Sequence, residues 1–330
     1  MIVGKLTAGL ALFAAFGLAT GMPGDARAQN RVQARIAVVQ PETAPNAMMW
    51  HRYRDLVRER TGGAVEFQVF AGGQLGGEKE MAEGMRLGSI QGADITLAAL
   101  SSWVPEGQIF DLPFIFRDVG HVERVVNGAI GERYKALYRA QNFEVPAFFT
   151  YGARHLISRQ PVLTVGEVRG KAMRVIQSPL HINIWRTLGA NPSPIPITET
   201  YNALSTGVVE MMDITKGVYE SLKLFEAAPN LTETGHIWAV GAISFSRQFW
   251  TRLSADQQRI LTATGVEMAT YINKLHMDLE AQAMVRVGQR GAKEHKIDQA
   301  PWRAALQPVL QAEAAKFGGM DKILEIANAP

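Results

Sequence analysis

The sequence contains no cysteine among its 330 residues. This absence excludes disulfide bonds, zinc sites built on thiolates, thiol nucleophiles and a lipid anchor attached through cysteine. The fold must therefore be held together by its hydrophobic core alone. A chain of this length exceeds the size at which single cores usually divide, so we expect two lobes.

A strong excess of charge of either sign is also missing. The chain has 34 lysines and arginines against 31 aspartates and glutamates, and these are scattered without a basic run. This balance argues against nucleic acid or a membrane surface as the partner. Long apolar runs are confined to the N-terminal segment, and there is no internal repeat or low-complexity tract.

Motifs that carry enzymatic chemistry are absent as well. The sequence has no G-x-S-x-G elbow, P-loop, G-x-G-x-x-G or H-E-x-x-H, and its seven histidines show no metal-ligand spacing. The Gly-rich segment Ala71–Glu80 could cradle a phosphate at a helix N-terminus. It lacks the P-loop lysine, and Glu78 and Glu80 would repel an anion, so we interpret it as a tight turn between a strand and a helix.

The N-terminal segment has the three parts of a secretory signal peptide. Lys5 supplies a positive charge, Leu6–Gly21 is an apolar core too short for a membrane span, and Ala26–Ala28 has the small–x–small pattern read by signal peptidase. We predict a signal peptide over residues 1–28, cleaved after Ala28, and an exported, soluble mature protein. The alternative is an uncleaved anchor helix.

The rest of the chain alternates strand and helix patterns. Ala64–Phe70 alternates with a period of two, as a half-buried strand does, whereas Met49, Tyr53 and Val57 recur at helical spacing. Further strands are expected at 35–39, 93–100, 144–153, 170–176 and 208–214, and further helices at 77–88 and 180–188. This alternation predicts an α/β fold with largely parallel sheets, in which ligands bind outside the C-terminal ends of the strands.

One predicted helix is much longer than the others. From Ser254 to about Arg290 there is no proline, and Ser254 is a good N-cap with Gln257 in capping-box position. Such a helix would be about 50 Å long, more than one lobe of this size, so we expect it to run across both lobes. A coiled-coil arm is the alternative, but the apolar positions do not hold a strict heptad.

Two arginines lie in apolar surroundings. Arg154 follows an apolar strand, and Arg174 lies inside a short apolar run twenty residues later. The simpler interpretation of Arg174 is a strand residue whose guanidinium reaches solvent. The alternative is a fixed cation in a cleft, where two converging arginines would bind an anion such as a carboxylate. The spacing alone leaves both interpretations open.

Five segments in order carry a family resemblance: Gly72–Ile95, Pro105–Asp118, Arg169–Val175, Leu188–Glu210 and Phe249–Gln258. Over essentially the whole mature chain, the sequence resembles the periplasmic solute-binding proteins of tripartite ATP-independent periplasmic (TRAP) transporters, the C4-dicarboxylate-binding family. The resemblance implies two α/β lobes spanned by one long helix. Lobe I would comprise residues 29–151 and about 240–279, and lobe II residues 152–239 and about 280–330.

The resemblance also implies a ligand site. Arg174 falls on the signature arginine of the family's G-x-K-x-R segment, which clamps the ligand carboxylate, although Lys171 is one place from the usual lysine. Arg154 falls on a second, assisting arginine. Gln177 stands where an amide that contacts the ligand is common.

The chain departs from the family pattern at one wall of this site. Ile214 replaces an asparagine that helps to hold the ligand, and Ile197 replaces an aromatic residue that often stacks on it. Losing the amide weakens the case for a second carboxylate or a polyhydroxylated ligand. Met211 and Met212 could add to an apolar wall or point into the core.

Three more residues are candidates for the site. Asp213 could form an ion pair with an arginine of its lobe, or accept a hydrogen bond from a ligand hydroxyl or ammonium group. Trp103 and Tyr151 could form an aromatic wall or pack in the core.

These observations lead to the hypothesis of a non-enzymatic, periplasmic binding protein for a small organic acid, which it delivers to the small and large membrane subunits of a TRAP permease. We expect a monocarboxylate with an apolar or aromatic body, and a C4-dicarboxylate is the alternative. A sensory binding protein that signals to a membrane receptor kinase is the other alternative. We expect a monomer without cofactor, metal or nucleic acid.

Overall fold

The computed structural model describes residues 31–330, so the predicted signal peptide and its cleavage site lie outside the described residues. One mixed sheet runs through the described chain in the order β2-β1-β3-β8-β4-β7-β5-β6, with β9 paired to β8. Its strands are β1 (Val32–Ala37), β2 (Val65–Phe70), β3 (Gly92–Thr96), β4 (Phe143–Ser158), β5 (Ala172–Val175), β6 (Asn191–Pro194), β7 (Met211–Thr215), β8 (Asn230–Ser246) and β9 (Lys293–His295).

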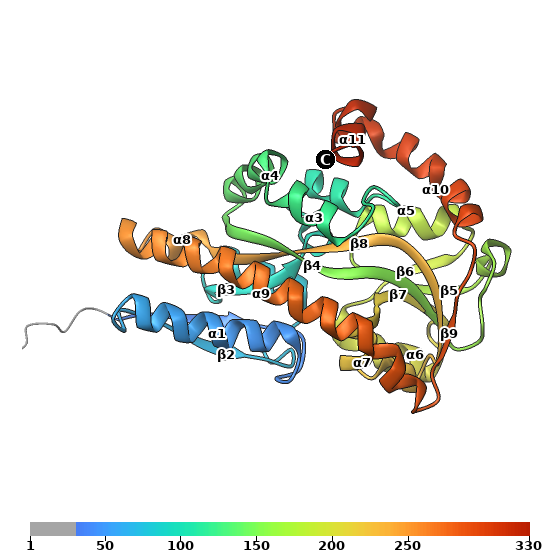
Figure 1. Ribbon diagram of the computed structural model, residues 1–330, viewed down its shortest axis with the longest axis horizontal. Coiled ribbons are helices and arrows are strands. Elements are labelled where there is room, and N and C mark those ends of the chain that lie inside the picture. Colours follow the sequence, from blue (N-terminus) through green and yellow to red (C-terminus); the bar gives the residue numbers. More distant parts are fainter. Residues whose placement is uncertain (1–30) are drawn as a thin grey trace, which may run out of the picture.

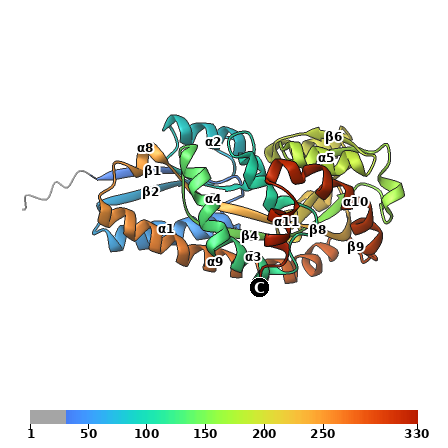
Figure 2. The ribbon, with the colours of Figure 1, turned by 90° about the horizontal axis from the view of Figure 1, so that it is seen from above.

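Helices cover both faces of this sheet (Figures 1 and 2). The α-helices are α1 (Pro45–Arg60), α2 (Glu78–Leu87), α3 (Val119–Val126), α4 (Ala129–Ala140), α5 (Pro179–Thr187), α6 (Thr200–Thr206), α7 (Lys216–Ser221), α8 (Arg247–Trp250), α9 (Ala255–Gly288), α10 (Ala300–Glu313) and α11 (Met320–Ala327). The 3-10 helices are η1 (Leu97–Leu100), η2 (Pro105–Asp111), η3 (Val165–Val168), η4 (Ile197–Glu199), η5 (Leu224–Glu226) and η6 (Ala314–Phe317). Within residues 31–330, no helix is both long and apolar enough to cross a membrane.

β4 and β8 form the middle of the sheet and connect its two halves (Figure 1). They are 16 and 17 residues long and pair antiparallel with each other. β3 pairs with the last part of β8, whereas β7 pairs with the last part of β4. The first lobe is therefore built around β1, β2 and β3, and the second around β5, β6 and β7, as the prediction of a two-lobe α/β fold requires.

The prediction of a largely parallel sheet is wrong at the centre. The β3–β8, β8–β4 and β4–β7 pairs are antiparallel. Parallel pairing joins β1 to its neighbours, β5 to its neighbours and the short strand β9 to β8. The physical reason is that the chain enters the second lobe along β4 and returns along β8, so the two central strands run in opposite directions.

Only the first half of the predicted strand at 93–100 is a strand in the structure. β3 ends at Thr96, and the apolar residues that follow form the 3-10 helix η1. Leu97 to Leu100 are all buried. A short, fully buried apolar run has no periodicity that separates strand from helix, so the sequence pattern could not locate this change.

The long helix forms where it was predicted. α9 spans Ala255–Gly288, and Ser254 and Gln257 make the predicted capping box. The helix contacts α1 in the first lobe, β4 in the middle and α7 in the second lobe. Figure 1 shows it crossing the molecule diagonally. It is a bridging helix and not a projecting coiled-coil arm.

The apolar core is divided by the sheet and not by the lobes. One cluster of buried side chains includes Met81 of α2 in the first lobe and Trp185 of α5 in the second. The other cluster includes Trp50 of α1 in the first lobe and Tyr219 of α7 in the second. Figure 2 shows α2 and α5 on one side of the sheet and α1 and α9 on the other. Each face of the sheet therefore has a core that passes through both lobes.

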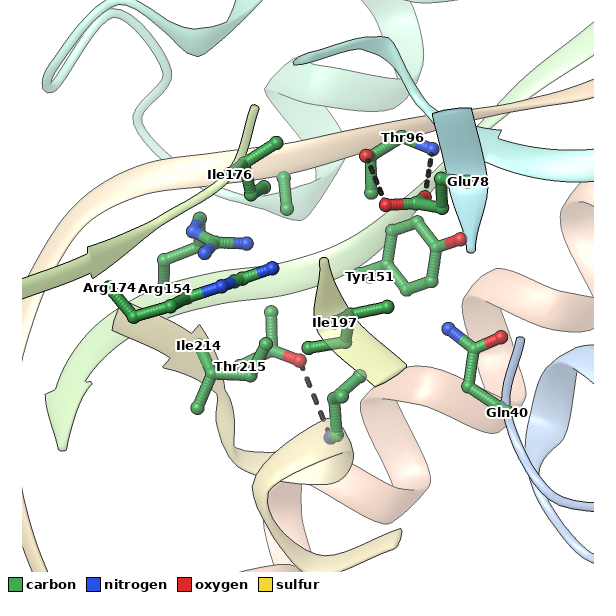
Figure 3. A pocket seen from close by; sticks show the side chains of 12 residues that line it. Gln40, Glu78, Thr96, Tyr151, Arg154, Arg174, Ile176, Ile197, Ile214 and Thr215 are labelled. Carbon is green, nitrogen blue, oxygen red and sulfur yellow. Dashed lines mark hydrogen bonds between the residues drawn. The ribbon is translucent and has the colours of Figure 1, made fainter. Parts of the chain in front are cut away.

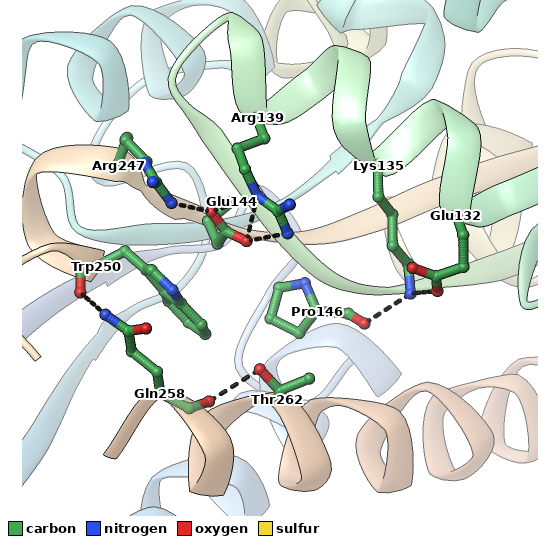
Figure 4. A network of polar contacts seen from close by, with 9 residues as sticks. All are labelled: Glu132, Lys135, Arg139, Glu144, Pro146, Arg247, Trp250, Gln258 and Thr262. Carbon is green, nitrogen blue, oxygen red and sulfur yellow. Dashed lines mark hydrogen bonds and ion pairs between the residues drawn. The ribbon is translucent and has the colours of Figure 1, made fainter. Parts of the chain in front are cut away.

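A polar network ties the first residues of β4 to the surrounding helices (Figure 4). The Glu144 carboxylate is buried and accepts hydrogen bonds from Arg139 Nη2 of α4 at 2.7 Å and from Arg247 Nη1 of α8 at 2.6 Å. Lys135 Nζ of α4 donates to the Pro146 carbonyl at 3.0 Å. These contacts position the strand that carries part of the site described below.

We expect Glu144→Gln to reduce the free energy of unfolding by about 1–3 kcal/mol, because it weakens charge-assisted hydrogen bonds to a buried acceptor. Urea denaturation followed by circular dichroism measures this loss. Glu132→Gln is the control, since the exposed Glu132 should change stability by less than about 0.5 kcal/mol. Equal midpoints for the two variants would contradict the role given to Glu144.

Candidate functional site

A cavity lies where the two lobes meet. Figure 3 shows the side chains around it. Both lobes and the connecting strands contribute to its lining, which consists of Gln40, Glu78, Thr96, Tyr151, Arg154, Arg174, Ile176, Ile197, Ile214, Thr215, Val218 and Ala239. Gln40, Thr96, Ile176 and Thr215 lie at or just after the ends of β1, β3, β5 and β7. The sheet thus places the cavity at C-terminal strand ends, as the α/β pattern predicts.

Arg174 of β5 points into this cavity as a buried cation (Figure 3). The residue is 2% exposed, and its Nε donates to the Ile195 carbonyl at 2.8 Å. Its Nη1 is buried without a hydrogen-bond partner, and no acidic residue in the described chain forms an ion pair with it. The interpretation of a guanidinium that reaches solvent is therefore wrong.

Burial lowers the pKa of Arg174 to about 10, and the neighbouring Arg154 acts in the same direction. The guanidinium is nevertheless charged at neutral pH. A buried charge is costly unless it is paired. The Arg174 side chain therefore offers an anion in the cavity a charged hydrogen-bond donor that has no other partner.

Arg154 of β4 differs from Arg174 because the protein already neutralises it. Its Nε donates to Asp213 Oδ2 at 2.6 Å, and its Nη2 donates to the Asp213 carbonyl at 2.5 Å. His236 Nε2 lies 3.3 Å from the same carboxylate oxygen. Burial alone would raise the pKa of Asp213, but Arg154 and His236 hold it well below its ordinary value. Asp213 therefore neutralises Arg154 from behind the cavity wall, and Arg174 has no ion-pair partner among the described residues.

The polar part of the first lobe's wall is built around Glu78. This residue begins α2, directly after the Gly-rich turn, and faces the cavity. Its carboxylate accepts from the Thr96 backbone N–H at 2.7 Å and from Thr96 Oγ1 at 3.0 Å. Burial raises the pKa of Glu78, although the bonds from Thr96 oppose this shift. The carboxylate of Glu78, which Thr96 fixes in place, is therefore a hydrogen-bond acceptor on the opposite side of the cavity from the arginines (Figure 3).

Comparison with known proteins identifies the family. A family model described as bacterial extracellular solute-binding protein, family 7, matches residues 36–316. The chain belongs to this family. It is 30% identical over 285 residues to a solute-binding protein of Sulfitobacter sp. strain NAS-14.1, covering 84% of this chain and 85% of that protein.

Solved structures of this family have the same fold. A TRAP periplasmic solute-binding protein from Polaromonas sp. JS666, bound to D-erythronate, superposes with a TM-score of 0.88 at 26% identity, covering 90% of this chain and 98% of the other. One from Bordetella, with density attributed to pantoate, has the same TM-score and identity and covers 91% and 100%. The predicted resemblance to TRAP solute-binding proteins and the two-lobe fold are confirmed.

For this family 7 protein, the structure brings most of the predicted site residues together. Arg154, Arg174, Tyr151, Ile197 and Ile214 all line the cavity. Their contact with a ligand stays a prediction. Ile197 and Ile214 join Ile176, Val218 and Ala239 in a largely aliphatic wall.

Three predicted residues are absent from the cavity lining. Asp213 is fully buried behind the wall as the partner of Arg154, which is the first of its two predicted roles. Trp103 is partly buried and packs edge-on against Phe143 at 5.9 Å between ring centroids, beside the core cluster that contains Met81 and Trp185. Gln177 follows Ile176, and only the isoleucine lines the cavity. Met211 and Met212 are likewise buried in the core.

Glu78 is the residue that sequence reasoning misjudged most. The Gly-rich segment is the predicted turn between β2 and α2, but its first acid was interpreted only as repelling an anion. Gln40, Thr96, Ile176, Thr215, Val218 and Ala239 were also missed. The available signal was position: Gln40, Ile176 and Thr215 lie at or just beyond the C-terminal ends of predicted strands, and Thr96 lies at the end of the observed strand β3.

Proposed function

We propose that this protein binds a small organic monocarboxylate between its lobes and delivers it to a TRAP-type permease with small and large membrane subunits. The observation that carries the proposal is the buried, unpaired guanidinium of Arg174 in the cavity wall. A carboxylate would supply the missing counter-charge and accept from the unpartnered Nη1. Export through the predicted signal peptide, cleaved after Ala28, would place the protein in the periplasm.

The lining favours a ligand with one carboxylate, a partly apolar body and at least one hydroxyl group. Aliphatic side chains would contact the body, and the carboxylate of Glu78 and the amide of Gln40 could bind a hydroxyl. A second carboxylate would meet Glu78, and Arg154 is already paired with Asp213. This disfavours a C4-dicarboxylate. The erythronate and pantoate named for two structural relatives are both hydroxy monocarboxylates, and pantoate also has an apolar dimethyl group.

A thermal-shift screen of the mature protein, unfolded and refolded to remove carried-over ligand, tests this proposal. D-Pantoate, D-erythronate, succinate and L-malate would each be added, together with the neutral lactones of the first two acids. We expect a hydroxy monocarboxylate to raise the melting temperature, since saturation at a hundred times the Kd adds about 2.7 kcal/mol, and its lactone to have no effect. Stabilisation by the lactones alone, or by the dicarboxylates at lower concentration, would contradict the proposal.

A further inference from the structure

We propose that Gly73 of the first lobe and Thr198 of the second form the contact that closes the cavity, and that this contact sets the ligand affinity without touching the ligand. The inference rests on the proposed function, because it assigns the affinity to that cavity. Gly73 lies in the Gly-rich turn after β2, and Thr198 lies in η4, on the other side of the cavity.

Gly73 lies close to the side chain of Thr198. A Cβ atom placed on Gly73 would lie 3.1 Å from Thr198 Cγ2, which is tighter than an ordinary van der Waals contact. A Cβ atom placed on Gly77 would lie 3.6 Å from Pro196 Cβ and 3.7 Å from Thr198 Oγ1. We call this contact between Gly73, Gly77, Pro196 and Thr198 the closing seam. A side chain at position 73 would crowd Thr198, whereas one at position 77 would make only ordinary contacts with Pro196 and Thr198.

The seam lies directly beside the proposed ligand site. Glu78, which follows Gly77, and Ile197, which precedes Thr198, both line the cavity. On its outer side the seam borders a groove lined by residues of both lobes, among them Gly72, Ile197, Thr198 and Tyr201. Ile197 belongs to both linings. The seam is therefore the wall that separates the ligand cavity from the outer groove.

The physical consequence follows from the closed-state equilibrium. A ligand held between two lobes binds tightly only when they are closed, so its apparent affinity falls with the fraction of closed molecules. A side chain at position 73 would meet Thr198 before the lobes had closed. It would lower the closed fraction while every residue of the cavity lining stayed unchanged.

The chain offers a matched control in the preceding residue. Gly72 and Gly73 have nearly the same backbone conformation, with φ of +70° and +71°, so a substitution carries a similar backbone cost at either position. A Cβ atom on Gly72, however, would meet nothing within 4 Å. Asparagine suits both positions because it tolerates the left-handed region better than other side chains.

The test compares Gly73→Asn with Gly72→Asn by isothermal titration with D-pantoate and D-erythronate. We expect Gly73→Asn to weaken binding at least about ten-fold, and Gly72→Asn to stay within about two-fold of the wild type. Similar melting temperatures of the two ligand-free variants would show that both fold. Equal affinities of the two variants would contradict the proposal that the closing seam sets the affinity, but would leave the proposed function unaffected.

Small-angle scattering of the ligand-free proteins gives a second readout that needs no ligand. We expect a larger radius of gyration for Gly73→Asn than for Gly72→Asn, because only the former keeps the lobes apart. If neither acid binds the wild type, the proposed ligand class is wrong. The role of the closing seam is then tested by scattering alone. Equal radii would overturn it.

Discussion

Asp213→Ala is expected to reduce the free energy of unfolding by about 3–5 kcal/mol, because it leaves a buried arginine without its counter-charge. Arg154 is 3% exposed and donates to both the carboxylate and the carbonyl of Asp213. His236 loses its contact with the same carboxylate. With the carboxylate gone, the guanidinium can regain water only by opening the structure around the cavity.

Urea denaturation at neutral pH measures this loss, and a double substitution tests its cause. Arg154→Met combined with Asp213→Leu removes both charges, and should recover most of the stability lost in Asp213→Ala, because the destabilisation comes from the unpaired charge and not from the missing atoms. A loss below about 1 kcal/mol in Asp213→Ala would mean that the pair contributes little to the fold.

Arg174→Met should have opposite effects on binding and on stability. Truncating one partner of a buried charge pair costs about 2–5 kcal/mol of binding energy, so the affinity for a carboxylate should fall about 30-fold or more. The ligand-free protein, in contrast, should melt at the same temperature or higher. The substitution loses the bond to Ile195 but also removes a buried charge that has no partner in the described chain.

Calorimetric titration and thermal unfolding of the ligand-free protein measure these two effects separately. Arg174→Lys should lie between the wild type and Arg174→Met in affinity, because lysine keeps the charge but lacks the planar fork. Arg169→Met, at an exposed position just before β5, should change neither quantity. Wild-type affinity in Arg174→Met, or a markedly lower melting temperature, would contradict the assignment of Arg174 as a site for an anion.

The parts of the fold that could be predicted are those whose signals are local. The capping box at Ser254 and the absence of proline after it define α9 without tertiary information. The antiparallel centre of the sheet could not be predicted in this way. It depends on β8 returning beside β4, a pairing between residues such as Phe143 and Ser246 that lie far apart in sequence.

The same distinction between local and tertiary signals applies to the site residues. Arg174 could be proposed from its position in an apolar run and from the family resemblance. The feature that distinguishes it from Arg154 is a partner on another strand: Asp213 of β7 lies beside Arg154 because β7 pairs with β4. Glu78 was misjudged for a similar reason. Its orientation depends on Thr96 at the end of β3, and no local pattern around Glu78 reveals that acceptor role.

Because the sheet, and not the gap between the lobes, divides the core, a lobe of this protein is a unit of shape but not a unit of folding. The two lobes determine the shape of the molecule and the position of its cavity. Neither lobe has a hydrophobic core of its own. The cluster around Trp50 and Tyr219 and the cluster around Met81 and Trp185 each pass through both lobes. Cutting the chain between lobes would open both clusters at once. We therefore expect the two lobes to unfold together, as one domain in the thermodynamic sense.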